Sequence, residues 1–471
     1  MFTRHDVWGL SEPDPWHPVL AWYARAVRLM RSRDGLDFAD PRSWRHLAET
    51  HGTSIGRDSW PAGARWNECE HGSWFFLPWH RLYLHHFERT VRAAVVELGG
   101  PSDWALPYWN YGDSARPDAR KLPPAFRASE MPGEPDNPLF AAERDQQLNN
   151  GTDMDTWATD ASAALAETIF AGDVTTPSFG GAEGDRAHTG GDPGILEIVP
   201  HGAVHMQIGG TGGWMSRFET AARDPIFWLH HANLDRLWEV WLHQGGRTNP
   251  ESSRWLHQWF EFGSGTWVTR LRVRDALDTE AEPLGYRYEE LPAELVAAGS
   301  FREAVGRRTM AEGVPPELIG ASRASVALGY DATSAEVDVQ RPQGPLAAEA
   351  GDGPSRIFLK IENVTGSRLA AGSYAVHLTS PGFALDGGEE GGTPAGIISL
   401  FGVRESSRAD EEHTRSGVSF TLDITDAANE LMGPGMEGLD RIGVRFTPLA
   451  AAARDEPEPD VQVGGIKIFA A

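Results

Sequence analysis

The sequence predicts a mainly α-helical domain followed by a C-terminal β-sandwich-like domain. Two observations predict this division. Up to about residue 290 the chain is rich in histidine and tryptophan and has apolar residues at helical spacing. After about residue 340 it has short runs of alternating apolar residues broken by Gly, Pro and Asp. We therefore expect a helical domain at residues 1–335, a linker at 336–355 and a β domain at 356–471.

Two long helices are predicted in the first domain. The stretch Phe75 to Leu98 (FFLPWHRLYLHHFERTVRAAVVEL) has apolar residues at helical spacing and is followed by Gly-Gly-Pro, a common helix stop. The stretch Pro225 to His243 follows Asp224, so it begins with an N-cap carboxylate and a proline in the first turn. Between the two helices, residues 111–195 are rich in Gly, Pro, Asp and Ala, which predicts long loops with short helices.

The end of the chain is expected to be a small antiparallel sandwich or barrel. A stretch rich in Pro and Gly, QRPQGPLAAEAGDGPS, is typical of a linker. The strands predicted beyond it are RIFLKIENV, GSYAVHL, IISLFGV, VSFTLDI, RIGVRFTPL and VQVGGIKIF.

Composition limits the partners and the compartment. The chain carries 67 acidic and 42 basic residues, a formal net charge of −25, which repels nucleic acid and anionic membranes. No run of roughly eighteen apolar residues and no signal peptide are found, so we expect no membrane span and a cytoplasmic location. The single cysteine, Cys69, excludes an internal disulfide framework.

Histidines after residue 200 form one candidate metal cluster. In His201-Gly-Ala-Val-His205 the imidazoles are four residues apart, so on a helix they share a face and can reach one metal. The second predicted helix adds His230-His231. Asp235 follows one turn later, where a carboxylate can orient a ligand imidazole.

A second cluster lies before residue 90. It contains Cys69-Glu-His71 and, after eight intervening residues, His80. The stretch SWRHLAETHG adds His46 and His51. Each of the two clusters can therefore supply three imidazoles.

The ligand type alone leaves the metal open, because imidazole binds copper, zinc, iron and nickel alike. A hydrolase with two zinc ions is one alternative, but a His-Glu-x-x-His helix is absent and no carboxylate stands out as a ligand. Three imidazoles per metal with open positions favour two copper ions that bind dioxygen between them. Histidines that only fill the core and surface are disfavoured because the two clusters agree in number.

Two stretches resemble the copper-binding regions of the tyrosinase, catechol oxidase and hemocyanin family. They are CEHGSWFFLPWHRLYLHHFER and PHGAVH…ARDPIFWLHHANLDRLW, and the pattern Asp-Pro-x-Phe-x-x-His-His-x-Asn-x-Asp-Arg-x-Trp in the second is rare elsewhere. The resemblance covers about residues 40 to 290 and continues through Trp255-Leu256 and Leu284-Gly-Tyr286-Arg-Tyr288. The strand-rich tail, ending GGIKIFAA, is similar to the C-terminal domain of plant polyphenol oxidases.

The resemblance implies six copper ligands. His51 is preferred to His46, because family members often have Ala three residues before this ligand and Gly directly after it, as in Ala48-Glu-Thr-His51-Gly52. The ligands are His51, His71 and His80 for copper A, and His201, His205 and His231 for copper B. The histidines expected to orient ligands or to pack are His46, His85, His86 and His230.

The resemblance also implies the chemistry: a copper-dependent polyphenol oxidase that converts o-diphenols to o-quinones with dioxygen and hydroxylates monophenols more weakly. Its cofactors are then two copper ions, its co-substrate is dioxygen and its partners are small phenolic molecules, with a copper-loading protein as a further partner. A hemocyanin-like oxygen carrier and an o-aminophenol oxidase are the alternatives.

Five further residues are expected to shape the reaction. Glu197 matches a glutamate that holds a water near the metals in plant members, and Asp235 is the expected orienting carboxylate. Phe218 matches an aromatic residue that covers copper A in plant catechol oxidases, and Met206 is expected to line the entrance. Gly202 stands where strong monophenol hydroxylases often have Asn or Asp, so we expect o-diphenols to be preferred.

Two features of the family concern modification and regulation. Cys69 stands two residues before His71, the Cys-x-His arrangement of fungal tyrosinases and molluscan hemocyanins, which implies a thioether bond between them. The tail resembles the plant domain that shields the copper site. Cutting the linker near Gly351 to Ser355 is therefore expected to raise activity.

Overall fold

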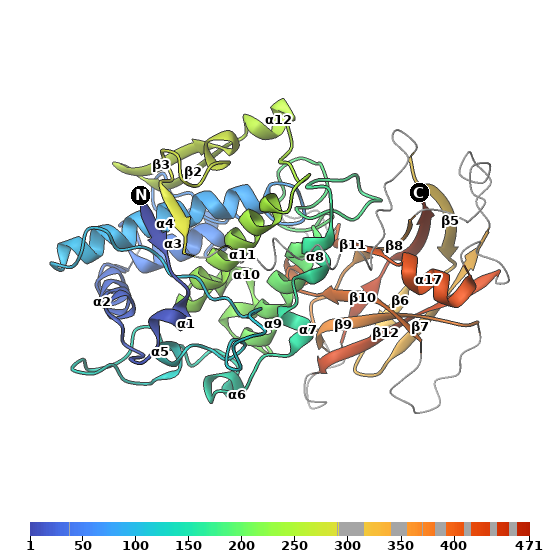
Figure 1. The fold of residues 1–471 in the computed structure, drawn as a ribbon, viewed down its shortest axis with the longest axis horizontal. Coiled ribbons are helices and arrows are strands. Elements are labelled where there is room, and N and C mark those ends of the chain that lie inside the picture. The colour runs from blue at the N-terminus through green and yellow to red at the C-terminus, as the bar shows by residue number, and fades with distance from the viewer. Residues whose placement is uncertain are drawn as a thin grey trace. The chain divides into compact units, whose positions relative to one another are not determined.

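The computed structural model describes residues 1–36, 38–289, 291, 315–340, 356–369, 371–381, 392–408, 416–433, 440–451 and 459–471. These residues divide into two compact units. The first consists of Met1–Glu70, Phe75–Phe170 and Val204–Ala297, and the second of His71–Trp74, Ala171–Ala203 and Ala298–Ala471. The prediction of a helical core and a C-terminal sheet region is confirmed (Figure 1).

Four helices form the centre of the first unit: α2 (Pro18–Ser32), α3 (Trp44–His51), α4 (Phe76–Glu97) and α11 (Pro225–His243). Helix α4 packs against both α2 and α11, and α2 also packs against α3. Helix α11 begins and ends at the predicted residues, because the Asp224 side chain accepts the Ile226 N–H at 3.0 Å and so caps the helix. Within the described residues, no helix has the length and apolar character that crossing a membrane requires.

Short elements complete the first unit. A parallel pair joins β1 (Phe2–Arg4) to β4 (Tyr286–Tyr288), and an antiparallel hairpin joins β2 (Trp259–Ser264) to β3 (Trp267–Arg272). The short helices are α1 (Val7–Leu10), α5 (Pro124–Arg127), α6 (Gln146–Asn149), α7 (Thr156–Thr159), α8 (Ser162–Ala166), α9 (Ala203–Gly209), α10 (Phe218–Ala221) and α12 (Ser253–Leu256), with η1 (Arg57–Ser59), η3 (Trp214–Ser216) and η4 (Val273–Ala276) as 3-10 turns.

The second unit is built on an eight-stranded antiparallel sheet in the order β10-β9-β12-β7-β5-β14-β8-β11. Its two edge strands, β10 and β11, contact each other, so the sheet curls around an apolar core. The strands are β5 (Glu317–Ser322), β7 (Thr333–Val339), β8 (Ile357–Val364), β9 (Ala371–Thr379), β10 (Thr393–Ser399), β11 (Val418–Asp423), β12 (Arg441–Ala451) and β14 (Gly465–Ala470), beside the pair β6 (Val326–Leu328) and β13 (Val461–Val463) and the helices α16 (Val403–Ser406) and α17 (Thr425–Met432).

This topology differs from the boundary at residue 335 and the linker at 336–355. Strands β5 and β7 pair with strands from the end of the chain, so the sheet already includes Glu317 and residues 336–339 are strand. The alternating pattern of 317–339 is short and interrupted, which hid these strands in the sequence. Residues 341–355 lie outside the described part of the chain.

The second unit also contains residues far upstream of the sheet. The Ser419 N–H donates to the Gly191 carbonyl at 2.9 Å, and the Lys360 ammonium pairs with the Asp192 carboxylate. Ile198 is buried in the same apolar core as the strands. The segment that carries Glu197 and His201 is therefore held by the sheet.

Candidate metal centre

Helix α3 places His51 at its last residue. Ser43 caps the helix by accepting the His46 N–H, and the helix stops at Gly52. A side chain at Gly52 has no room, because its Cβ would lie 2.5 Å from the Phe218 carbonyl oxygen. The same carbonyl is 3.1 Å from Nδ1 of His51, so the tight approach at Gly52 positions the imidazole.

Helices α4 and α11 bring His80 and His231 together. The two rings stack with centroids 4.5 Å apart and planes 10° from parallel. The ring of His51 lies 5.7 Å from that of His80 and 6.3 Å from that of His231. Three of the six expected ligands, from three packed helices, thus face one another in the buried centre of the first unit.

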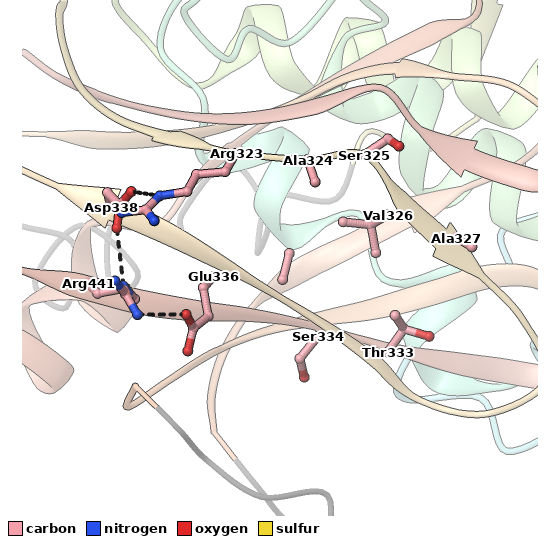
Figure 2. A pocket seen from close by; sticks show the side chains of 11 residues that line it. Arg323, Ala324, Ser325, Val326, Ala327, Thr333, Ser334, Glu336, Asp338 and Arg441 are labelled. Carbon is pink, nitrogen blue, oxygen red and sulfur yellow. Dashed lines mark hydrogen bonds and ion pairs between the residues drawn. The ribbon is translucent and has the colours of Figure 1, made fainter.

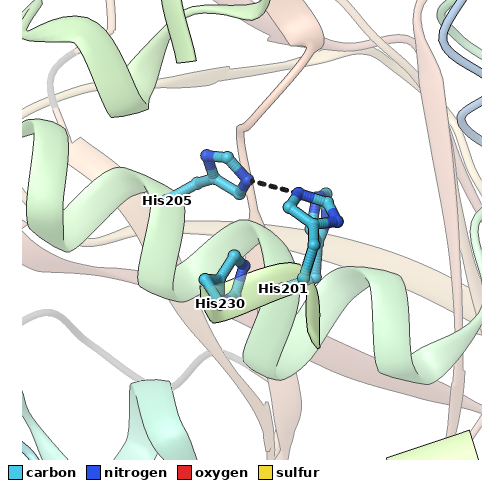
Figure 3. A group of neighbouring side chains, drawn as sticks. His201, His205 and His230 are labelled. Carbon is cyan, nitrogen blue, oxygen red and sulfur yellow. Dashed lines mark hydrogen bonds between the residues drawn. The ribbon is translucent and has the colours of Figure 1, made fainter. Parts of the chain in front are cut away.

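His201 and His205 lie on consecutive helical segments, as their spacing predicts. The segment η2 (Glu197–Gly202) is a wide helical turn whose one residue outside helical geometry, Val199, precedes both histidines, and α9 continues directly from Ala203. His205 reaches His231, since their Nε2 atoms are 3.3 Å apart. In Figure 3, the dashed line from the His205 ring marks this contact, and the His230 ring is labelled beside it.

Main-chain carbonyls fix the tautomer of four of the expected ligands. A carbonyl oxygen only accepts hydrogen bonds, so an imidazole Nδ1 within hydrogen-bonding distance of one must carry the proton. Each Nδ1–H leaves Nε2 with the lone pair that a metal needs. The four contacts are His51 to Phe218 at 3.1 Å, His80 to Phe76 at 2.8 Å, His201 to Glu197 at 3.0 Å and His205 to Met215 at 2.7 Å.

Burial also favours the neutral form that binds metals. His80 lies in α4 with almost no exposed surface, and this desolvation lowers its imidazole pKa to about 3. The other five expected ligands are likewise buried.

The ligand atoms fall into two groups. Within the first unit, nitrogens of His205, His230 and His231 all lie within 4.8 Å of one another, and the ligand atoms of His51 and Cys69 satisfy the same limit. His80 is in neither group, although its ring stacks on His231. His230 was expected only to orient or pack, and the structure adds it to the first group while its Nδ1 contacts the Tyr111 hydroxyl at 3.2 Å.

Two other histidines lie outside both groups. His46 turns its Nδ1 to the Phe38 carbonyl at 2.9 Å and packs its ring against Trp66. Nδ1 of His86 hydrogen-bonds to the Thr269 hydroxyl at 2.8 Å. Both side chains fill the core, as expected for residues that are not ligands.

Glu197 is tied to the backbone beside His71. Its two carboxylate oxygens accept the Gly72 N–H at 2.8 and 3.1 Å. Desolvation raises the pKa of this buried carboxyl well above its usual range. Gly72 has φ +68°, and a Cβ there would lie 1.6 Å from the Gly190 carbonyl oxygen, so only glycine permits this approach.

The other residues expected to shape the site are also buried. Phe218 packs edge-on against His51 with centroids 5.8 Å apart. Met206 follows His205 in α9 and keeps 9% of its surface exposed. Gly202 is buried directly after His201.

The structure gives Asp235 a different role from the expected one. Its carboxylate accepts hydrogen bonds from Arg4, Arg81 and the hydroxyls of Tyr286 and Tyr288. These arginines hold the pKa of Asp235 below its usual range, against the opposing effect of desolvation. Asp235 therefore joins β1, α4, α11 and β4 instead of orienting a ligand imidazole.

Two aromatic residues at the centre were missed in the sequence. Phe227 lies 4.2 Å from His231 and 5.0 Å from His51 by ring centroids, and its place in the Asp-Pro-x-Phe pattern was the available signal. Phe401 lies 5.3 Å from His201 and 6.1 Å from His71. No local pattern marks Phe401, because its partners are about 200 and 330 residues away in sequence.

A pocket in the second unit offers no competing metal site. It encloses about 440 Å³ between β6, β7 and Arg441 (Figure 2). Asp338 pairs with both Arg323 and Arg441, and Arg441 also pairs with Glu336. The pocket's cations are neutralised by its own carboxylates, and no histidine lines it.

Comparison with known proteins places these groups in context. Residues 41–244 match the sequence family described as the common central domain of tyrosinase, and residues 315–471 match a domain of unknown function, DUF7868. A tyrosinase of Hahella sp. (strain CCB-MM4) is 34% identical over 497 residues, which cover 99% of this chain and 99% of that protein.

Two solved structures share the fold along almost the whole chain. Latent apple tyrosinase has a TM-score of 0.62 at 23% identity, covering 100% of this chain and 97% of its own. Deoxygenated hemocyanin from Rapana thomasiana has a TM-score of 0.54 at 17% identity, covering 98% and 99%. The fold is therefore shared with a protein named as a tyrosinase and with one named as a hemocyanin.

Proposed function

The chain belongs to the tyrosinase family of type-3 copper proteins, and on this premise we propose that it oxidises o-diphenols to o-quinones and hydroxylates monophenols more slowly. One observation carries the proposal: buried imidazoles form two groups, and main-chain carbonyls hold the proton on Nδ1 of four of the six expected ligands, which leaves each Nε2 lone pair available to a metal. The proposed partners are small phenolic molecules.

The donor set fits copper. The two groups contain imidazole nitrogens and one thiol but no carboxylate, whereas hydrolytic zinc sites commonly include one. When bound, two copper ions supply the redox chemistry by which two o-diphenols pass four electrons to one dioxygen, giving two o-quinones and two waters. The protein holds the imidazoles and keeps the site dry.

We assign Glu197 the phenolic proton. Its carboxylate is buried, both of its oxygens accept the Gly72 N–H, and burial raises the pKa of the carboxyl toward that of a phenol. The Gly72 N–H holds the Glu197 carboxylate next to His71. The main-chain carbonyl of Glu197 accepts a hydrogen bond from Nδ1 of His201. A phenol has a pKa of about 10, so its deprotonation at neutral pH needs such a group.

Gly202 supports the preference for o-diphenols. It provides no side chain beside His201 to polarise a water near Glu197. Monophenols depend on that help before the ring is hydroxylated, whereas o-diphenols need no hydroxylation. Phe218 packs against His51, and Met206 directly follows His205 in α9; in the proposed function both limit how a phenol ring enters.

We also propose that the turn after β10 shields the centre. Phe401 lies against the rings of His71 and His201, where a phenol would have to approach. This observation equally favours the second candidate, an oxygen carrier, because a carrier needs the ligands but must keep phenols out. Measuring activity before and after cleavage of the tail distinguishes an oxidase from an oxygen carrier.

Oxygen consumption by the copper-loaded chain tests the proposal, with dopamine, tyramine and an o-aminophenol as substrates, before and after cleavage within residues 292–314 and removal of the fragment that carries the sheet. We expect sustained uptake with dopamine, a lag or slow uptake with tyramine, and none in a sample stripped of copper by a chelator. Reversible oxygen binding without turnover, in intact and cleaved protein alike, would establish the carrier instead. Equal initial rates on tyramine and dopamine would refute the diphenol preference.

A further inference from the structure

Gly202 meets the C-terminal sheet at one residue, Ser399. A Cβ added to Gly202 would lie 2.7 Å from Oγ and 3.1 Å from Cβ of Ser399. Gly202 does not have a left-handed φ, so its backbone conformation is open to other residues. Packing, and not backbone conformation, therefore favours glycine at this position. The two atoms nearest to an added Cβ belong to Ser399.

The backbone of Ser399 is held in place by the strand pairing and by burial. Ser399 is the last residue of β10, it pairs with Ser373 of β9, and 3% of its surface is exposed. The next residue, Leu400, is buried in the apolar core and donates its N–H to the Gly372 carbonyl at 2.9 Å. The Ser399 hydroxyl can rotate about χ1, but its Cβ can shift only together with the strand.

The same turn carries the aromatic ring that covers the ligands. Phe401 follows Ser399 by two residues and its N–H points to the Ser399 hydroxyl at 3.4 Å. Its ring stands edge-on to that of His201, at 83° and 5.3 Å. The turn 399–401 therefore rests on the backbone directly after His201, at the glycine.

We infer that position 202 decides whether the turn 399–401 can seat over His71 and His201. A side chain at 202 would turn the Ser399 hydroxyl away and push the end of β10 back by a few tenths of an ångström, so it opposes the seated turn, whereas glycine at this position permits a closed state. The inference rests on the proposed function, in which the turn shields the centre. Gly202 then has two effects. It favours o-diphenols over monophenols, and it controls the access of both kinds of phenol to the metal centre.

The variants are Gly202→Ala and Gly202→Asn, each alone and the first combined with Ser399→Gly. Glycine at 399 removes the two nearest atoms that an added Cβ would meet and leaves the Glu197 carbonyl oxygen at 3.3 Å. Gly329→Asn is the matched control, because a Cβ at Gly329 meets nothing within 4 Å and its φ is not left-handed.

The first measurement is the rate on dopamine of the intact copper-loaded chain divided by its rate after cleavage within residues 292–314, ahead of β5, and removal of the fragment that carries the sheet. A cut within 341–355 would leave β5 and β7 paired with β14 and β12. Dividing by the cleaved form cancels any effect of residue 202 on the chemistry itself. The second measurement is amide hydrogen exchange of peptides containing residues 399–401, in copper-loaded and copper-free protein.

We expect Gly202→Asn to raise the ratio of intact to cleaved rate at least fivefold, toward one. The same variant should speed amide hydrogen exchange of residues 399–401 in both copper-loaded and copper-free protein. Gly202→Ala should raise it less, and adding Ser399→Gly should return it to the wild-type value. Gly329→Asn and Ser399→Gly alone should match the wild type.

A wild-type ratio together with wild-type exchange in Gly202→Asn would overturn the inference. If that variant does not fold, a raised ratio in Gly202→Ala that Ser399→Gly fails to lower would overturn it. If neither intact nor cleaved wild type oxidises any phenol, the proposed function fails. Hydrogen exchange alone then decides whether position 202 controls how the turn 399–401 packs over His71 and His201.

Discussion

Removing Arg144 should unfold the site by exposing the start of α11, the helix that carries His231. The Arg144 guanidinium forms a two-pronged ion pair with Asp224, with Nε–Oδ2 at 2.8 Å and Nη2–Oδ1 at 2.6 Å, and both side chains are fully buried. Asp224 also caps α11. Arg144→Met keeps most of the volume but leaves a buried carboxylate without its cation.

The structure sets the size of the loss. Breaking a buried ion pair by removing one partner costs about 3–5 kcal/mol. Arg144 also donates to the carbonyls of Phe126 and Leu139, at 2.5 and 2.8 Å, and each buried acceptor left without a donor costs about 1–3 kcal/mol more. We expect a total loss of at least about 5 kcal/mol, a large share of the roughly 5–15 kcal/mol by which domains are stable.

Chemical denaturation of the copper-free protein measures the loss, and copper content after refolding reports on the site. Adding Asp224→Asn should recover about 2 kcal/mol, because asparagine can still cap the helix and leaves no buried charge. The matched control is Lys121→Met, which breaks an exposed pair with Asp118 and should leave the unfolding free energy close to that of the wild type. A loss below about 1 kcal/mol for Arg144→Met would refute the reasoning.

Three further predictions test other parts of the chain. A thioether between Cys69 and His71 should make the copper-loaded protein two hydrogens lighter and leave no titratable thiol after denaturation, whereas a free thiol would exclude the bond. Cleavage within residues 292–314 and removal of the fragment that carries the sheet should raise activity on o-diphenols severalfold, and unchanged kinetics would contradict shielding by the tail. Burial lowers the pKa of His86 from 6.5 to about 3, so the stability that this neutral imidazole provides is present above pH 6.5 and is lost as the pH falls toward 3. In copper-free protein, His86→Gln should therefore flatten the fall in unfolding free energy between pH 6.5 and 4, and an unchanged pH profile would rule this out.

The helices that carry ligands were predictable because each combines a periodic apolar face with a local stop or start. Asp224 and Pro225 start α11 at the expected residue, and α4 begins and ends within one residue of the prediction. The turn at Glu197–Gly202 was not predictable in this way. The spacing of His201 and His205 correctly indicates helix, but it does not show that Val199, ahead of both, leaves helical geometry or that the apolar core of the sheet buries Ile198.

Contacts distant in sequence were the other limit. Asp235 has the spacing of an orienting carboxylate, yet its partners come from the first strand and from Tyr286 and Tyr288. The stretch IISLFGV reads as one strand, although β10 ends at Ser399 and Phe401 leaves it to meet His201. Period-2 patterns show which residues are apolar but not where a strand gives way to a turn.

The hydrogen bonds from four imidazole Nδ1 atoms to main-chain carbonyls have a consequence for evolution and design. Every amino acid has a backbone carbonyl, so replacing the side chains of Phe76, Glu197, Met215 or Phe218 does not remove the acceptor that sets each ligand's protonation. Lineages can therefore vary the residues around the metals, and engineers can reshape the pocket, while the coordinating nitrogens keep their lone pairs.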